Sequence, residues 1–282
     1  MRAVKLMEWA IVPILAVLIL STLINGATLL YGGTDAIIKF LSFYGKEPLT
    51  YVPDYIQITT LAFGFSFVVA AVLLIIALAK REFLAHHATP FLRWGLLATI
   101  VGLTCYAFGV RMLANHQAAA QAYFYLVLVY GILWYVERRN VVVNSVRWHA
   151  AKLLPIYLML MITMGLPGFQ KIFNAAGSMP MYVAMFEGSI LAHLPGGVAP
   201  LVYVLGVAEL AICVLMLVGL VRGELSPKSP KPFLLWGLGL ALITFVMLLF
   251  GLSILLNFPG ATGLVFYAIL TFGLMLYVGQ EA

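Results

Sequence analysis

The sequence predicts an all-α integral membrane protein with eight transmembrane helices, arranged as two parallel four-helix repeats. Three observations predict this fold: the composition, eight long apolar runs and an internal repeat. Of the 282 residues, 64% are hydrophobic and 9% are charged. Such a chain has too little polar surface to cover a water-soluble domain, so the lipid bilayer is its expected solvent. The net charge of +6 is dispersed among apolar segments, and no nucleic-acid partner is expected.

The eight apolar runs are each close to the length that crosses a bilayer, which is about 20 helical residues for roughly 30 Å of hydrocarbon. They lie near 9–31, 55–79, 92–114, 119–136, 153–175, 198–221, 233–256 and 261–278. The intervening segments 34–50 and 176–196 contain Pro, Gly and charged residues. We expect them to form short helices that fold back over the outer face.

The basic residues indicate the orientation, because cytoplasmic loops of membrane proteins are enriched in Lys and Arg. Four of the 16 fall on or toward the side opposite the N-terminus: Lys39, Lys46, Arg111 and Lys171. The other twelve fall on the side of the N-terminus. We therefore expect both termini to be cytoplasmic, with a bacterial-type inner membrane as the simplest host.

An internal repeat sets the predicted domain organisation. PFLRWGL at 90–96 recurs as PFLLWGL at 232–238, and the same offset of 142 positions aligns further identical residues from Gly26 through Val136 without a gap. The predicted units are a first repeat at 1–139, an interfacial linker at 140–152 and a second repeat at 153–282. Each repeat has an even number of helices, so the two should enter the bilayer in the same direction. Glycines such as Gly64 and its partner Gly206 are expected to admit close helix packing.

Glu209 is the most informative single residue, since it lies near the middle of the sixth apolar run. A carboxylate at that depth costs about 2.5–3.5 kcal/mol on insertion scales, so it needs a partner, a cavity or a proton path. A protonated Glu209 that is hydrogen-bonded to a neighbouring helix is the structural alternative. Lys171 is a candidate partner, or it could extend to water. With the two backbones about 10 Å apart in height, a direct ion pair is a hypothesis.

Two further residues belong to this predicted polar site, and Pro167 beside them is a predicted structural residue. Gln170 and Asn174 could line the same pocket as Lys171, or could face the outer water. Pro167, just before them, is expected to kink or end the regular helix.

The second repeat resembles the DoxX/DoxD-like family of four-helix membrane proteins. The resemblance lies in GFQK at 168–171, LGVAEL at 205–210 and LVGL at 217–220, which look like the family's Gly-x-x-Lys, its intramembrane Glu and its helix-closing Gly. Gly168 and Gly219 are thereby identified as structural residues. The first repeat departs from the pattern, because Leu29 and Phe67 stand where Lys171 and Glu209 would be. The resemblance implies a membrane protein that works beside oxidoreductases, and that only the second repeat kept the polar site.

The leading functional hypothesis is an accessory or quinone-interacting subunit of a larger redox complex, with an apolar cavity in the second repeat framed by Lys171 and Glu209. A transporter that uses the buried Glu and a structural anchor for a peripheral partner are the alternatives. The sequence has no nucleophile paired with a base, so catalysis by the chain alone is not expected. No haem or metal is expected either, because the five histidines lack the spacing of a metal site. Quinone is the candidate cofactor, and other membrane or peripheral subunits are the candidate partners.

Overall fold

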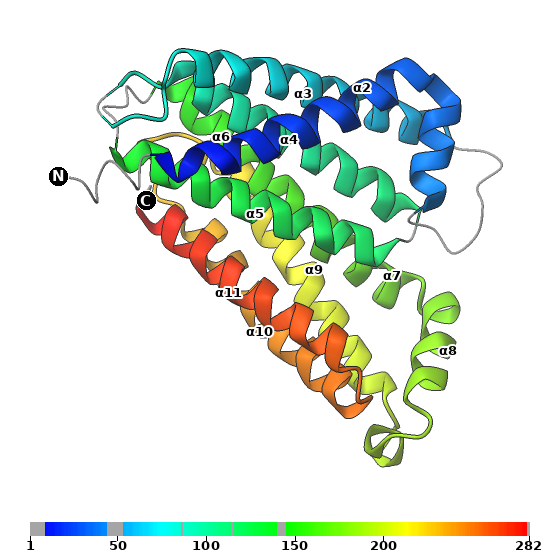
Figure 1. Ribbon diagram of the computed structural model, residues 1–282. Helices are drawn as coiled ribbons and strands as arrows, with labels where there is room; N and C mark the ends of the chain where they lie inside the picture. The colour runs from blue at the N-terminus through cyan, green and yellow to red at the C-terminus, as the bar shows by residue number, and fades with distance from the viewer. Residues whose placement is uncertain (1–8, 44–52, 86, 114, 140–144, 281–282) are drawn as a thin grey trace. The chain divides into compact units, whose positions relative to one another are not determined.

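The computed structural model describes residues 9–43, 53–85, 87–113, 115–139 and 145–280 (Figure 1). Within these ranges every regular element is a helix. Eight of the helical stretches are long and apolar enough to cross a membrane, namely Ile11–Phe40, Asp54–Ala79, Pro90–Met112, Gln117–Arg139, Val146–Phe173, Ala199–Val221, Pro232–Ile254 and Phe258–Gln280. The predicted all-α membrane class is confirmed, and the chain is a multi-pass membrane protein.

The chain divides into two compact units, Met1–Pro155 and Ile156–Ala282. Four helices form most of the first unit: α2 (Ile11–Phe43), α3 (Asp54–Ala79), α4 (Pro90–Met112) and α5 (His116–Arg139). They pack in chain order, with α2 against α3, α3 against α4 and α4 against α5. Helix α2 bends at Gly33, whose φ of 52° and ψ of −140° are not helical and suit a residue without a Cβ.

The second unit follows the same packing order, but several short helical segments precede its long helices. After α6 (Val146–Leu160) come a π-helical turn at Met161–Gly165, α7 (Leu166–Phe173), α8 (Ala175–Phe186) and a 3₁₀ turn at Ile190–His193. Three long helices complete the unit: α9 (Ala199–Val221), α10 (Pro232–Ile254) and α11 (Phe258–Gln280). Helix α7 packs against α9, α9 against α10 and α10 against α11.

The start of the fifth span differs from the prediction. The sequence assigned 140–152 to an interfacial linker, but helix α6 already begins at Val146 and continues into the span. Trp148, His149 and Lys152 are buried, so these side chains pack within the protein. Residues 140–144 lie outside the described part of the chain.

Local geometry recurs between the units at the repeat offset. Arg81 and Gly223, 142 positions apart, both adopt positive φ. Arg81 follows the end of α3, and Gly223 follows the end of α9. The carboxylate one residue later then accepts backbone N–H groups from the start of the next helix: Leu92 donates to Glu82 at 2.8 Å, and Leu234 donates to Glu224 at 3.1 Å. Each Glu therefore caps the helix that follows it. How the two repeats are arranged relative to each other stays a prediction.

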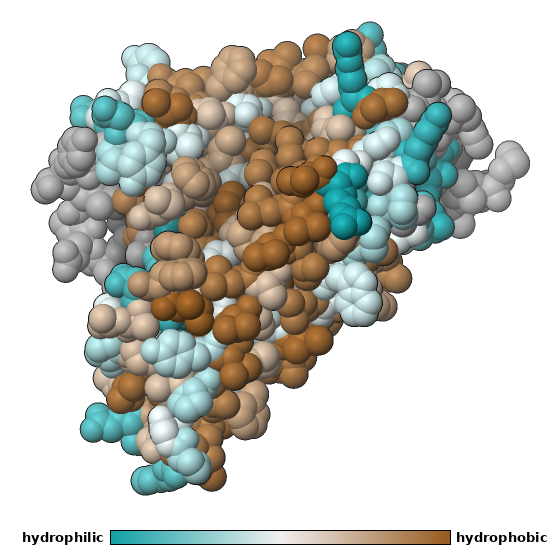
Figure 2. Space-filling view, turned by 180° about the vertical axis from the view of Figure 1, so that it is seen from behind, coloured by the Kyte–Doolittle hydropathy of each residue, from teal (hydrophilic) through white to brown (hydrophobic). Residues whose placement is uncertain are grey.

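The exposed side chains of the long helices are mostly apolar. Large hydrophobic residues are exposed along α9 and α10, including Val204, Val207, Val214, Leu217, Trp236, Ile243, Val246 and Phe250. Apolar side chains cover much of the face seen in Figure 2. Such a surface is unfavourable in water and suits contact with lipid.

Candidate functional site

Lys171 and Glu209 form a direct ion pair inside the second unit. Lys171 Nζ lies 2.7 Å from Glu209 Oε1 and 2.6 Å from Oε2. The two residues are only 4% and 2% exposed. Tyr182 of α8 adds its ring face, whose centroid is 5.8 Å from the ammonium, and a cation over an aromatic face is stabilised. The structure thus forms the pair that the sequence left as a hypothesis.

Two glycines bring the helices that carry this pair together. A Cβ on Gly168 of α7 would lie 2.8 Å from Glu209 Cβ, and a Cβ on Gly206 of α9 would lie 2.9 Å from Lys171 Cβ. The two backbones are therefore level at the pair, and the predicted height difference of about 10 Å is wrong. Lys171 does lie near the end of the span Val146–Phe173, as expected, and the close crossing of α7 and α9 at Gly168 and Gly206 brings Glu209 beside it.

Glu209 occupies the buried face of α9. Val202, Gly206, Glu209, Ile212, Met216 and Gly219 recur every three or four residues and are all buried, as expected for one face of a helix. The residues on either side of Glu209 along this face are apolar or Gly. Its carboxylate therefore depends on Lys171 for charge compensation.

The helix that carries Lys171 is irregular just before it. The π-helical turn at Met161–Gly165 precedes α7, and Pro167 lies in the first turn of that helix. Pro has no N–H to donate to the carbonyl one turn earlier, so it disfavours a regular α-helix at this point. The expected interruption of regular helix near Pro167 is confirmed. π-helical turns occur frequently at functional sites, and this one lies a turn and a half before Lys171.

Of the two roles that the sequence left open for Gln170 and Asn174, the structure favours the one outside the pocket. Both residues are exposed, so neither lines a pocket with the ion pair. Gln170 directly precedes Lys171, and successive helical residues differ in direction by about 100°. Asn174 would share the face of Lys171 in a continuous helix, but it has φ −117° and ψ 41° and ends α7.

Gly219 makes room for a second polar contact in the same unit. Tyr157 on α6 donates its hydroxyl to Glu224 Oε2 at 2.6 Å. A Cβ on Gly219 would come within 2.8 Å of that same oxygen and 3.0 Å of the tyrosine ring. The glycine at the end of α9 therefore permits the hydrogen bond that joins Glu224 to α6.

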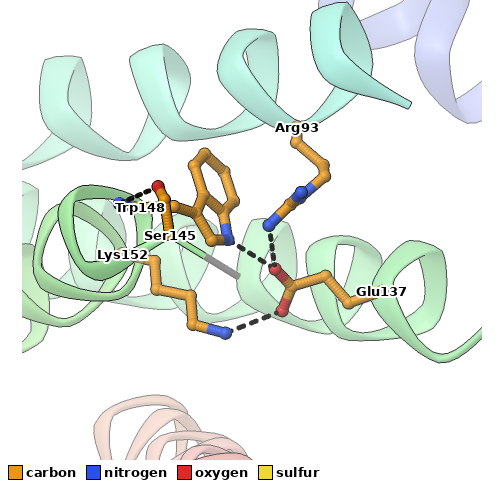
Figure 3. A network of polar contacts seen from close by, with 5 residues as sticks. All are labelled: Arg93, Glu137, Ser145, Trp148 and Lys152. Atoms are coloured by element: carbon orange, nitrogen blue, oxygen red, sulfur yellow. Dashed lines mark hydrogen bonds and ion pairs between the residues drawn. The ribbon is translucent and has the colours of Figure 1, made fainter. Parts of the chain in front are cut away.

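The first unit has a polar network of its own, which the sequence analysis missed. Glu137 on α5 accepts hydrogen bonds from Trp148 Nε1 at 2.8 Å, Arg93 at 3.2 Å and Lys152 Nζ at 3.1 Å (Figure 3). The Arg93 guanidinium also lies 4.1 Å from the Trp148 ring centroid. The available signal was that Glu137 is a lone acid followed by four cations within 15 residues.

A cavity that the sequence did not predict lies away from Lys171 and Glu209. The helices are in contact at the glycines next to the pair. A cavity of about 720 Å³ lies instead in the first unit, among α2, α3, α4 and α5. Phe67, which occupies the position equivalent to Glu209, is one of its lining residues.

Comparison with protein-family models, curated proteins and solved structures finds no match to this chain. The resemblance to the DoxX/DoxD-like family stays a prediction.

Proposed function

We propose that this chain is a DoxX-like accessory subunit of a larger membrane redox complex and is not catalytic on its own. The observation that supports this proposal is the convergence of the residues that carry the resemblance. Gly168 and Lys171 come from α7, and Glu209 comes 38 residues after Lys171 from α9, yet the three form one closed contact.

The close packing around the ion pair favours a supporting role over solute transport. A coupling site in a transporter alternates between two sides of the membrane and needs access to water or substrate. Here the carboxylate accepts two short contacts from one ammonium and is 2% exposed. The pair is therefore well placed to fix α7 against α9 beneath an attached partner.

The proposal includes location and orientation. We place the chain in a bacterial-type inner membrane with both termini cytoplasmic, on the distribution of Lys and Arg. The loops that contain Arg81 and Arg222 would then face the cytoplasm, where a peripheral redox subunit could bind.

The test is co-purification in a mild detergent from the native host, with proteomic identification of the bound subunits. Oxidoreductase subunits in stoichiometric amounts are the expected result. A double variant, Lys171→Met with Glu209→Gln, removes the charges but keeps the approximate volumes, and should weaken the association if the pair organises the docking face. An isolated protein that moves a solute across liposomes would contradict the proposal and favour a transporter.

A further inference from the structure

A lateral cavity in the first unit has the size of a small-molecule site. Its volume is about 720 Å³, within the roughly 300–1,000 Å³ typical of ligand pockets. Helices α2 and α5, the first and last of the unit, supply most of its lining, including Val17 and Ser21 on one side and Ala122 and Tyr125 on the other. Val17 and Tyr125 are exposed, so the cavity opens on the outside of the unit between these two helices.

One wall of the cavity is aromatic. The ring of Phe63 lies 4.3 Å from Phe67, 5.2 Å from Tyr106 and 5.9 Å from Phe40, measured between centroids. All four residues line the cavity. Clustered aromatic faces provide a surface on which a flat ring can stack. The second unit cannot build this wall, because Leu205, Glu209 and Leu248 occupy three of the equivalent positions.

The polar groups of the lining are neutral. None of the residues that line the cavity is Lys, Arg, His, Asp or Glu, which disfavours a phosphate or carboxylate head group. The hydroxyls of Thr22 and Thr99 donate to carbonyls of their own helices at 2.7 Å and 3.0 Å. Asn25 and Gln121 contribute side-chain amides, whose N–H groups suit ring carbonyl oxygens.

An apolar groove continues from the cavity along α2 and α5. It has a volume of about 360 Å³ and shares Ile14, Leu128 and Ile132 with the cavity. Its remaining lining residues are Ala10, Ile11, Gly131 and Tyr135. The groove therefore leads from the aromatic wall toward the N-terminal end of α2, and can hold a narrow hydrocarbon chain.

We propose that this cavity and groove bind a lipid with a flat, neutral, carbonyl-bearing ring and a long apolar tail, the chemistry of the isoprenoid quinones. The ring would stack on the Phe63 cluster and accept hydrogen bonds from Asn25 or Gln121, while the tail would lie in the groove. The inference extends the proposed function by naming the ligand class and its place, which is the first unit and not the ion pair. It concerns binding alone and assigns no electron transfer to this chain.

The experiment uses the purified full-length chain in nanodiscs and a photoreactive azidoquinone with an isoprenoid tail. Cross-linked peptides are identified by mass spectrometry, and unlabelled ubiquinone is the competitor. Labels should map to the residues that line the cavity and groove, within 10–40, 63–67, 99–106 and 121–135, and ubiquinone should remove them. Solanesol, an isoprenoid alcohol with the same kind of tail and no quinone ring, should not.

A matched pair of variants tests the groove without disturbing the fold. A Cβ on Gly131 meets no atom within 4 Å, and the same holds for Gly273, its repeat partner in the second unit. Gly131→Leu would fill the groove and should lower quinone labelling by about tenfold, equivalent to about 1.4 kcal/mol. Gly273→Leu has the same helix and hydrophobicity effects and should leave labelling unchanged. Gln121→Leu should weaken binding severalfold through loss of a hydrogen-bond donor.

Labels that map outside the first unit, or equal labelling of the two glycine variants, would overturn the inference. Competition by solanesol as effective as that by ubiquinone would overturn the ligand class. The outcome is separable from that of the proposed function. Redox subunits that co-purify with a chain lacking quinone would refute this site alone, and specific quinone binding by a chain without partners would refute only the accessory role.

Discussion

The two units share one helix crossing but fill it with different chemistry. In the first unit a Cβ on Gly26 would lie 2.8 Å from Gly64 O, and in the second a Cβ on Gly168 would lie 2.9 Å from Gly206 O. Next to this shared crossing, the first unit has an apolar leucine and phenylalanine, whereas the second has a lysine and a glutamate at the equivalent positions. The close approach of the backbones therefore does not require the ion pair.

The difference shows what each choice of side chain permits. Phe67 joins an aromatic cluster beside a cavity, whereas Glu209 binds Lys171 where the helices pack tightly. A charge in an apolar environment is costly unless it is paired. Loss of either Lys171 or Glu209 should therefore destabilise the second unit. The first unit has no such constraint at this position, and its interior is open to a ligand.

The largest expected effect comes from removing one charge of the pair. Lys171→Met leaves Glu209 buried and without its cation, which should destabilise the second unit by about 3–5 kcal/mol. Leu29→Met at the equivalent position is the control, and a swap between apolar residues of similar volume should cost less than about 1.5 kcal/mol. Thermal unfolding in mild detergent measures both. Equal losses would mean that the two units differ in sequence but not in energetics.

The Glu137 network should give the next largest effect. Glu137→Ala leaves Arg93 and Lys152 close together without their shared anion, and should cost about 3 kcal/mol. Glu187→Ala is the control at an exposed acid, where a change within about 0.5 kcal/mol is expected. The same unfolding measurement decides the matter, and comparable shifts in the two variants would show that the network contributes little.

The glycine crossing should be moderately sensitive. Gly168→Ala places a Cβ 2.8 Å from the backbone nitrogen of Leu210, so the helices must separate, at a cost of about 2 kcal/mol. Gly273→Ala meets open space and should be neutral or slightly stabilising through its helix propensity. If Gly168→Ala unfolds at the same temperature as Gly273→Ala, the close approach is not required.

The smallest expected effect is a pH dependence at Glu82, which lies between the α3 and α4 spans. Burial raises the pKa of this carboxyl, and the Leu92 N–H and the Lys80 charge offset the rise in part. Because the folded state then holds the proton more tightly than the unfolded state, this group favours folding most at low pH. Its contribution declines as pH rises from the usual glutamate pKa through the raised one. Glu82→Gln should remove that slope in unfolding temperature between about pH 4 and 7, and an unchanged slope would assign it to another group.

Much of the fold could be predicted from the sequence because hydrocarbon thickness fixes the length of an apolar helix. The described spans fall close to the expected ones. The start of the fifth span could not be predicted, since Trp148 and Lys152 look like interfacial residues until Glu137 is placed beside them. Hydrogen bonds and ion pairs between side chains on different helices leave no pattern in the local sequence.

The candidate site was predictable in its charges but not in its surroundings. Lys171 and Glu209 were found because ionisable residues in apolar segments are costly. The two alternatives for Asn174 could not be separated from the sequence because its direction depends on where α7 ends. The cavity of the first unit was not predicted, since its walls come from four helices separated by up to about a hundred residues, and a void reflects packing that no single segment encodes.

The most direct test of the account is a double-mutant cycle on the ion pair, with Lys171→Met, Glu209→Gln and the double variant compared by unfolding free energy. We predict that each single substitution is strongly destabilising and that the double variant loses at least about 2 kcal/mol less than their sum, because removing both charges leaves neither one buried alone. Losses that add to within about 0.5 kcal/mol would contradict the account, since two residues that act independently do not form the contact that distinguishes the second unit from the first.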